Sequence, residues 1–420
     1  MANSLTKVEQ IAWEYGCEAF ENMNVFAKNA DVFKPDATAS ALAGQTMRIP
    51  YANQIETVSG LDISGQEKDV LDVTVPISLA TSDIKNGLFA LDVNESTVER
   101  RVRDNVNASV RKISSDISTE IANLAIDRGA LAQGFTGDLT NYEQLSSGTA
   151  LLDLVEATGY DRYLYLPPRI HQKIANELGS RATDNSRDHK AYERGELPMI
   201  GDMMTFKTNS IKQIGVNAVT TVTVNGANQD VTPIAYNSDG GYAAGETDDI
   251  RTQTLTVTNT SGSLTNGDIF TIAGVNRIGI DTKNDTGELM TFRVVSGGGT
   301  TSVTISPAIV ASGQHQNVSA APANGAVINA VNTVATSPAV FTSKDAFKLY
   351  CDDLNWEALD GSAATVLGTY VTSSGVQVAF LKQGSIDTGK VQYRLSAWCK
   401  PNLVDPLKCG IILPNQSAAF

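Results

Sequence analysis

The sequence has no unbroken run of eighteen or more apolar residues, and charged residues interrupt its N-terminal segment where a signal peptide needs an apolar core. We therefore expect no membrane partner, and a protein that stays in the cytosol after synthesis or leaves it by a route other than secretion. The sequence also has only four cysteines, which form no CxxC pair and show no ligand-like spacing to its three histidines. Reduced, buried thiols are favoured over a zinc site or a disulfide framework, and no metal is expected.

Positive charge and catalytic signatures are scarce as well. The 32 lysine and arginine residues are outnumbered by 46 aspartate and glutamate residues, which gives a formal net charge of -14. A protein whose main task is to coat nucleic acid needs a concentrated basic surface, so that class is disfavoured, although a local basic face remains open. No GxSxG sequence and no Cys/His signature accompanies His171 or His189. We therefore expect neither an enzyme nor a cofactor.

Two runs of alternating apolar and polar residues flank a polar stretch that contains glycine. Met47, Ile49 and Tyr51 belong to the first run, and the odd positions from Leu71 to Leu79 form the second. This two-residue period is typical of half-buried strands. The intervening SGLDISGQEK makes a tip of roughly ten residues, longer than the usual two to five. We predict an extended antiparallel hairpin, which is only marginally stable alone and needs a neighbour, such as another copy of the chain.

Another run of apolar residues has helical spacing. Its members follow one another at intervals of three or four residues: Val98, Val102, Val106, Val110, Ile113, Ile117, Ile121 and Leu124. Ser96 with Glu99 fits a capping box, and Gly129 supplies a C-terminal stop. We predict one helix of roughly thirty residues, about 45 Å long. A shorter helix is predicted near the N-terminus from the spacing of Val8, Ile11, Ala12, Tyr15 and Ala19.

Composition changes abruptly between about residues 220 and 336. Thr, Val, Asn, Gly and Ser dominate there, charged residues thin out, and strand-like stretches such as TQTLTVTN, DIFTIAG, MTFRVVSG and TSVTISP follow at short intervals. This pattern predicts an all-β domain, either a small sandwich or a barrel. The mixed character returns after it, so we predict that the β domain is inserted within another domain.

Four stretches, taken in order, carry a resemblance to a known family: GLDISGQEKDVL at the hairpin tip, AIDRGALAQG at the end of the long helix, GDIFTIAGVNRI in the insert and YRLSAWCKPNLVDPLKCGIILPNQ near the C-terminus. Together with the order of the predicted parts, they resemble the major capsid proteins of tailed bacteriophages, which have the Hong Kong ninety-seven fold. Within that group the chain is most similar to coat proteins of the P-twenty-two type from short-tailed phages, which carry an inserted domain.

The resemblance implies an α+β fold of the Hong Kong ninety-seven type with an inserted all-β domain. The hairpin would lie over a neighbouring subunit of the same capsomer, and the long helix would be the spine of a peripheral domain. The expected parts are an N-terminal arm (1–44), the extended hairpin loop (45–82), the peripheral domain with the spine helix (83–134), the first part of an axial domain (135–220), the inserted β-barrel-like domain (221–337) and the return of the axial and peripheral domains (338–420).

The resemblance also implies a function. The chain would assemble with a scaffolding protein into the icosahedral shell that encloses phage double-stranded DNA. Its partners would be copies of itself in pentamers and hexamers, a scaffolding protein, a portal protein, and packaged DNA contacted without sequence specificity. Nothing upstream of the arm looks like a long cleavable scaffold segment, so the scaffolding protein is expected to be separate. The protein would be made in the cytoplasm of the host bacterium and end in the virion capsid.

The main alternative is a cell-surface or fibre-like β-rich adhesin, because modules rich in Thr, Asn and Gly also occur there. An adhesin of this kind is expected to carry a secretion signal and internal repeats, and neither is present in the sequence. The capsid interpretation is therefore favoured.

Two groups of polar residues are expected to contact other copies of the chain. The hairpin tip would contribute Asp62, Ser64, Gln66, Glu67 and Lys68. In the insert, the loop NSDGGYAAGETDD lacks the alternating aspartates and terminal glutamate of an EF-hand calcium loop, so a solvent-facing loop is favoured. Its place matches a loop that reaches the adjacent capsomer in the resembled family, where Asp248, Asp249 and Arg251 would pair with opposite charges.

An acidic stripe is expected on the N-terminal helix. Glu14, Glu18 and Glu21 share one face, where like charges four residues apart repel by a few tenths of a kcal/mol. A solvated face is the simpler interpretation. The resemblance adds another, in which this scaffold-facing stripe recruits a basic segment of the scaffolding protein through weak, salt-sensitive contacts.

A basic group is expected at the start of the long helix. Arg100, Arg101 and Arg103 are available to contact the phosphates of packaged DNA, with Arg100 and Arg101 as the DNA-facing candidates. The simpler interpretation, which we favour, is that Glu99 pairs with Arg103 at i,i+4 on an exposed face.

Overall fold

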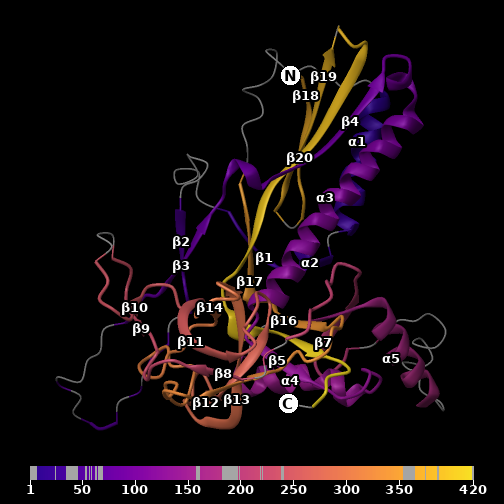
Figure 1. The fold of residues 1–420 in the computed structure, drawn as a ribbon. Coiled ribbons are helices and arrows are strands. Elements are labelled where there is room, and N and C mark those ends of the chain that lie inside the picture. The colour runs from indigo at the N-terminus through magenta and orange to yellow at the C-terminus, as the bar shows by residue number, and fades with distance from the viewer. Residues whose placement is uncertain are drawn as a thin grey trace. The chain divides into compact units, whose positions relative to one another are not determined.

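The computed structural model describes residues 7–23, 25–34, 46–52, 54–55, 57, 59–61, 64, 70–157, 161–181, 197, 199–217, 219, 221–237, 241–352, 365–373, 375–385 and 387–418 (Figure 1). The chain forms two compact units, each built from segments that are far apart in the sequence. Unit 1 comprises Met1–Met47, Ile77–Ile121 and Phe347–Asn402, and unit 2 comprises Arg48–Pro76, Ala122–Ala346 and Leu403–Phe420. Each unit is described separately below.

Unit 1 is built on a six-stranded sheet. Its main path runs β1 (Asp31–Phe33), β17 (Phe347–Cys351), β20 (Lys390–Leu403), β19 (Gln377–Ser385) and β18 (Thr365–Val371), and β4 (Ile84–Asp92) also pairs with β20. The pair β1–β17 is parallel, whereas β18, β19, β20 and β4 pair in antiparallel fashion. β4 and β20 pair over their whole common length, from Ile84 opposite Trp398 to Asp92 opposite Lys390.

The N-terminal helix α1 (Lys7–Met23) buries a face different from the one that the sequence predicted, and the short helix α2 (Val25–Asn29) follows it. Ala12, Gly16 and Phe20 are buried, while Tyr15 is 50% exposed. The reason is close packing, because a Cβ atom at Gly16 would lie only 2.7 Å from Cγ1 of Val106. The small residues must therefore face the neighbouring helix, and this turns Tyr15 outward.

The predicted spine helix is confirmed as α3 (Glu99–Arg128), which has 30 residues. The members of its apolar stripe from Val102 to Ile121 are buried, whereas Val98 precedes the helix and is half exposed. The predicted capping box at Ser96 is wrong. Short 3-10 turns, η1 (Thr81–Asp83) and η2 (Glu95–Thr97), flank β4, and within η2 the Ser96 hydroxyl donates to the carbonyl of Val93 at 2.7 Å. That hydroxyl therefore stabilises the turn before α3.

Unit 2 contains a five-stranded sheet that is buried on both faces. Its order is β5 (Leu131–Gly134), β21 (Cys409–Leu413), β16 (Ala339–Ser343), β6 (Arg162–Leu166) and β7 (Met203–Lys207). The outer pairs β5–β21 and β6–β7 are parallel and the inner pairs are antiparallel. Every residue of β6, β16 and β21 is buried, as expected for central strands. Helices α4 (Tyr142–Leu154) and α5 (Pro168–Arg181) and the 3-10 turns η3 (Lys344–Ala346) and η5 (Pro406–Lys408) complete this part.

The predicted β insert contains a closed barrel. Its strand order is β11 (Gln253–Ser261), β14 (Ser302–Ser306), β13 (Asp285–Ser296), β12 (Ile269–Ile278), β15 (Val327–Ala330) and β8 (Thr221–Val224). Adjacent strands are antiparallel, and alternate residues such as Val222, Leu255 and Val257 point into an apolar interior. A separate short pair, β9 (Thr232–Pro233) and β10 (Glu246–Thr247), lies in the loops between β8 and β11. The exact limits of the insert, 221–337, stay a prediction.

Side chains of the barrel bind the backbone that links α3 to β5 within unit 2. The Ser306 hydroxyl donates to the carbonyl of Arg128 at 2.9 Å, Thr291 donates to that of Ala130, and the fully buried Arg293 donates to that of Leu131 at 3.1 Å. Burial lowers the pKa of Arg293 to about 9. These contacts hold the barrel against the first strand of the five-stranded sheet.

The two hairpin strands are present as β2 (Thr46–Pro50) and β3 (Thr74–Ser78), which form a two-stranded sheet. The predicted alternation is confirmed by the buried residues Ile49, Tyr51, Val73, Val75, Ile77 and Leu79. Of the predicted tip residues, only Ser64 lies within the described part of the chain; Asp62, Gln66, Glu67 and Lys68 lie outside it.

Candidate functional site

The histidines and cysteines of the described residues do not combine into a reactive centre. His171 lies on α5, where burial and the nearby Lys207 lower its pKa, and His189 is outside the described part of the chain. Within that part, no cluster of three or more His, Cys, Asp or Glu side chains is placed to hold a metal ion. None of the four cysteines forms a disulfide, and none of the described helices is both long and apolar enough to cross a membrane. The surfaces described next are those that the sequence analysis predicted to contact other molecules.

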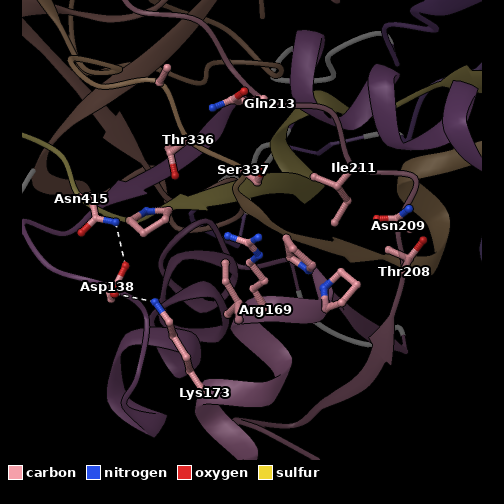
Figure 2. A pocket seen from close by; sticks show the side chains of 15 residues that line it. Asp138, Arg169, Lys173, Thr208, Asn209, Ile211, Gln213, Thr336, Ser337 and Asn415 are labelled. Atoms are coloured by element: carbon pink, nitrogen blue, oxygen red, sulfur yellow. Dashed lines mark hydrogen bonds and ion pairs between the residues drawn. The ribbon is translucent and has the colours of Figure 1, made fainter.

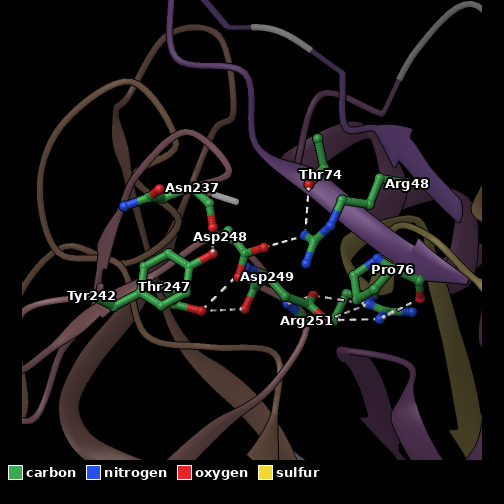
Figure 3. A network of polar contacts seen from close by, with 9 residues as sticks. All are labelled: Arg48, Thr74, Pro76, Asn237, Tyr242, Thr247, Asp248, Asp249 and Arg251. Carbon is green, nitrogen blue, oxygen red and sulfur yellow. Dashed lines mark hydrogen bonds and ion pairs between the residues drawn. The ribbon is translucent and has the colours of Figure 1, made fainter. Parts of the chain in front are cut away.

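The base of the hairpin is attached to a barrel loop of the same unit by Arg48, a half-buried residue of β2 (Figure 3). Its guanidinium forms an ion pair with Asp248 and donates a hydrogen bond to the Thr74 hydroxyl of β3 at 3.1 Å. The same group lies 3.5 Å from the centre of the Tyr236 ring, within cation–π distance. The backbone amide of Thr74 also donates to the carbonyl of Asp248 at 3.2 Å. Both hairpin strands are thus joined to one loop.

A second arginine, Arg251, reaches the hairpin from the same loop. Its guanidinium donates to both carboxylate oxygens of Asp249, from Nε to Oδ1 at 2.9 Å and from Nη2 to Oδ2 at 2.7 Å. Nη2 also donates to the carbonyl of Pro76 in β3 at 3.3 Å (Figure 3). The three residues expected to pair with an adjacent capsomer, Asp248, Asp249 and Arg251, are therefore paired within their own chain. Their role between capsomers stays a prediction.

Another set of contacts holds the hairpin beyond its strands. The Lys283 ammonium donates to Oε1 of Gln54 at 2.6 Å and to the carbonyl of Gln314 at 2.8 Å. The Leu71 amide donates to Oε1 of Gln314 at 3.2 Å, and Nε2 of His315 lies 3.2 Å from the Leu71 carbonyl. Burial is the main cause of the lowered pKa of His315. These contacts come from loops of the barrel module and involve both sides of the hairpin.

Tyr51, just after β2, is bonded to a buried carboxyl group. Its side chain forms a hydrogen bond with Asp405, which also accepts a hydrogen bond from the Leu407 amide at 3.0 Å. Lys408 lies 3.7 Å from the same carboxyl group. Burial nevertheless raises the pKa of Asp405 and that of Tyr51. The sequence analysis missed this acid because it is separated from Tyr51 by most of the chain.

The part of the hairpin farther from the strands has a different character. Ile55 is 79% exposed, Val70 is 52% exposed and Leu61 is fully exposed. Exposed apolar side chains mark an interaction surface where they gather into one patch, and these three belong to the same segment between β2 and β3. The hairpin therefore combines a polar, anchored base with an uncovered apolar part.

On α1, in unit 1, the predicted acidic stripe faces outward. Glu14 and Glu18 are exposed, and Glu14 accepts one hydrogen bond from Gln10 at 3.2 Å. Glu21 belongs to the same helix, but its side chain lies outside the described residues. The scaffold-facing role of this stripe stays a prediction.

The sequence analysis missed a fourth glutamate of α1. Glu9 is buried, and its Oε1 accepts hydrogen bonds from Lys382 at 2.6 Å and from the Tyr393 hydroxyl at 3.0 Å. Burial, together with this carboxylate, raises the pKa of Tyr393. Trp13, one turn farther along α1, stacks on Phe380 with ring centres 5.6 Å apart. The sign in the sequence was that Glu9 shares one helical face with Ala12, Gly16 and Phe20, and this face is otherwise uncharged.

Arg100 and Arg101 at the start of α3 are exposed and paired locally. Arg101 forms an ion pair with Glu95 at 2.9 Å, and Arg100 lies 3.7 Å from Asp104 at i,i+4. We expected Arg103 to pair with Glu99. In the structure the Arg103 guanidinium instead lies 5.5 Å from the centre of the Tyr15 ring. Tyr15 attracts it because α1 turns that ring outward.

An open pocket of about 540 Å³ lies in unit 2 beside the start of α5 (Figure 2). Arg169 and Lys173 are on this helix, and Asp138 accepts hydrogen bonds from Lys173 at 2.5 Å and from Asn415 at 2.7 Å. The hydrogen bond from Lys173 is the main cause of the lowered pKa of Asp138. None of the residues predicted from the sequence lines this pocket.

Solved structures provide the first comparison with known proteins. A chain of Mycobacterium phage Che8 is 11% identical with a TM-score of 0.44, and the match covers 94% of this chain and 92% of that one. The capsid structure of the cyanophage P-SCSP1u is 10% identical with a TM-score of 0.46, covering 93% of this chain and 88% of that one. The CUS-3 coat protein I-domain is 40% identical with a TM-score of 0.21, covering 27% of this chain and 96% of that domain.

A family model provides the decisive comparison. The model described as "P22 coat protein - gene protein 5" matches residues 1–415, which includes the hairpin, the spine helix, the barrel and the last strands. The resemblance inferred from the sequence and the phage capsid fold of the Hong Kong ninety-seven type are thereby confirmed, and the adhesin alternative is not favoured. The chain belongs to the P22 coat protein family and is a major capsid protein of a bacteriophage.

Proposed function

We propose that this structural protein assembles with a separate scaffolding protein into an icosahedral shell around phage double-stranded DNA, and that its hairpin joins neighbouring copies. The observation that carries the proposal is the uncovered apolar part of the hairpin at Ile55, Leu61 and Val70. Burial of apolar surface contributes about 25 cal/mol of favourable free energy per Å². Covering these side chains with a second copy of the chain therefore favours association. The hairpin is an adhesive element, and no catalytic group is needed in it.

Deletion of residues 60–68 tests this role. We expect a folded, soluble subunit that fails to form shells, because Leu61 and the polar tip are lost while the anchored hairpin base remains. Electron microscopy of assembly reactions and thermal unfolding of the subunit are the two measurements. Normal shells from the deleted chain would show that the hairpin does not join copies, and unfolding of the subunit would show that the tip supports its own fold.

The exposed acidic stripe of α1 is proposed to bind a basic segment of the scaffolding protein. Weak electrostatic contacts suit a partner that must leave before DNA fills the shell, because salt and competing charges reverse them. Replacement of Glu14, Glu18 and Glu21 by glutamine is expected to slow scaffold-dependent assembly. An unchanged assembly rate in the triple variant would assign the stripe to solvent.

The remaining partners are also proposals. Arg100 and Arg101 would contact packaged DNA at phosphates, in exchange for their pairs with Asp104 and Glu95. Asp248, Asp249 and Arg251 would pair across to an adjacent capsomer, and a portal protein would occupy one position of the shell.

A further inference from the structure

We propose that Arg48, with Asp248 and Arg251, forms a clamp that positions the hairpin for assembly. The inference rests on the proposed role of the hairpin between copies. The clamp joins β2 and β3 to the loop that precedes β11, within unit 2, and it sets the direction in which the uncovered part of the hairpin leaves this loop. Arg48 is thus a positioning residue for assembly, distinct from the residues that touch the neighbouring copy.

The geometry of Arg48 shows why a single side chain can hold both strands. It belongs to β2, its Nη1 atom reaches the Thr74 hydroxyl on β3, and the same atom pairs with Asp248 of the barrel loop. The Thr74 amide closes a ring of contacts by donating to the Asp248 carbonyl. Because these bonds converge from two strands on one residue of the loop, they restrict rotation of the hairpin about its base as well as its distance from the loop.

The charges of the clamp are balanced and mostly shielded from water. Arg48 and Asp248 have side chains 27% and 15% exposed, and Arg251 and Asp249 are shielded to a similar degree. The clamp thus contains two ion pairs, Arg48 with Asp248 and Arg251 with Asp249, and it has no net charge. An ion pair at this depth is partly screened by salt, and it adds a directional contact to the buried apolar residues of the two strands, such as Ile49 and Val75.

Arg251 extends the clamp to the middle of β3. Asp249 holds its guanidinium in a side-on, two-bond arrangement, which leaves Nη2 directed at the Pro76 carbonyl (Figure 3). Nη1 donates to the carbonyl of Leu403 at 3.3 Å, which ties the same loop to the C-terminal segment of unit 2. The second arginine therefore connects the hairpin to a buried framework through backbone atoms.

Positioning matters because a two-stranded ribbon has little rigidity of its own. The side chains expected to meet a neighbour, Ile55, Leu61 and Val70, all lie beyond the clamp. A small rotation at the base moves them by a larger amount, so loss of the clamp leaves the adhesive surface intact but misdirected. The same clamp also occupies the charges proposed to act between capsomers, so that contact must compete with it.

The test compares Arg48→Ala, Arg48→Lys and the exchanged pair Arg48→Asp with Asp248→Arg. Lys112→Ala is the matched control, because it removes an exposed cation that pairs with Asp116 at 2.5 Å on α3. We measure amide hydrogen exchange at Thr74 and at the barrel residue Ile272 in the isolated full-length subunit. Scaffold-dependent assembly of the same variants is followed by light scattering and electron microscopy.

In Arg48→Ala we expect exchange at Thr74 to rise by about tenfold, exchange at Ile272 to stay at the wild-type rate, and misassembled particles to replace closed shells. Arg48→Lys should fall between Arg48→Ala and the wild type, since lysine keeps the charge but loses the planar contact with Tyr236. The exchanged pair should recover part of both the protection and the assembly, and Lys112→Ala should leave them unchanged.

Two results would overturn the inference. Unchanged exchange at Thr74 in Arg48→Ala would show that the clamp does not hold the hairpin. Increased exchange with normal shells would show that the clamp holds the hairpin but does not position it for assembly. The proposed function is tested by a different experiment, the deletion of residues 60–68. Normal shells from that chain would refute the role of the hairpin between copies, independently of the results for the Arg48 variants.

Discussion

Two N-terminal parts of this coat protein, α1 and the hairpin base, are each attached to a distant part of the chain by an ion pair, and the two attachments differ in kind. On α1 the carboxylate of Glu9 is 2% exposed and lies among packed rings. At the hairpin base Arg48 and Asp248 are both partly open to water, and Arg48 also contacts the Thr74 hydroxyl and the Tyr236 ring. The difference separates a fixed packing contact from a directional and exchangeable one.

The physical basis of this difference is desolvation. A buried charge whose partner is removed keeps the cost of leaving water, so loss of Lys382 would leave the Glu9 carboxylate uncompensated and destabilise the unit. A partly exposed pair can exchange its partner for water at small cost. An element that must bind a neighbouring copy is better served by the second kind of attachment.

The largest effect is expected from Glu9→Ala. Removal of the buried Glu9 side chain leaves a cavity and takes the acceptor from the buried Tyr393 hydroxyl, whereas Lys382, 32% exposed, can turn to water; we expect the free energy of unfolding to fall by about 3 kcal/mol. Denaturant unfolding monitored by tryptophan fluorescence measures this, and Glu14→Ala on the exposed face of α1 is the control, with a change within about 0.5 kcal/mol. Exposed ion pairs contribute less than about 1 kcal/mol to stability. A smaller loss than this in Glu9→Ala would show that the Glu9–Lys382 pair behaves like an exposed pair.

Gly16→Val is expected to have the next largest effect. A Cβ atom at this position would lie 2.7 Å from Cγ1 of Val106, so a branched side chain must push α1 away from α3. Overpacking of this kind costs about 2 kcal/mol. The double variant Gly16→Val with Val106→Ala should recover part of the lost stability in the same unfolding experiment. Equal losses in the single and the double variant would argue against a steric cause.

A smaller, pH-dependent effect is expected from Asp405→Asn at the hairpin base. Burial raises the pKa of Asp405 above its ordinary value of 3.8, so the folded protein binds the proton more tightly than the unfolded chain. The stability that this proton contributes is complete below the ordinary pKa and is lost as pH rises through the raised one. The slope reaches at most about 1.4 kcal/mol per pH unit.

The unfolding free energy of the wild type should therefore decrease relative to that of Asp405→Asn as pH increases above 4. Denaturant titrations at several pH values measure the difference between the two proteins. A difference that is independent of pH would show that Asp405 does not titrate differently in the folded and unfolded states.

The smallest effect is expected from salt. At 1 M salt the screening length is about 3 Å, which weakens a partly exposed ion pair more than a buried one. Exchange at the Thr74 amide should rise by about two- to threefold between 0.05 and 1 M sodium chloride, while amides of α1 keep their rates. An equal response of both regions would remove the proposed distinction between them.

The local periodicities of the sequence determined the elements that carry the fold. The spacing of Val102 to Ile121 predicted α3, and the alternation from Val73 to Leu79 predicted β3. The composition change near residue 220 predicted the barrel module. These predictions succeeded because burial of one face depends on the spacing of apolar residues within a single element.

Tertiary structure alone decided which charges meet. Arg48 pairs with Asp248, which is 200 positions away in the sequence, and Glu9 pairs with Lys382. Packing against Val106 likewise decided that Gly16, and not Tyr15, faces the neighbouring helix. Nothing in the local pattern specifies such partners, because electrostatic and steric contacts depend on distance in space, and the fold of the whole chain sets that distance.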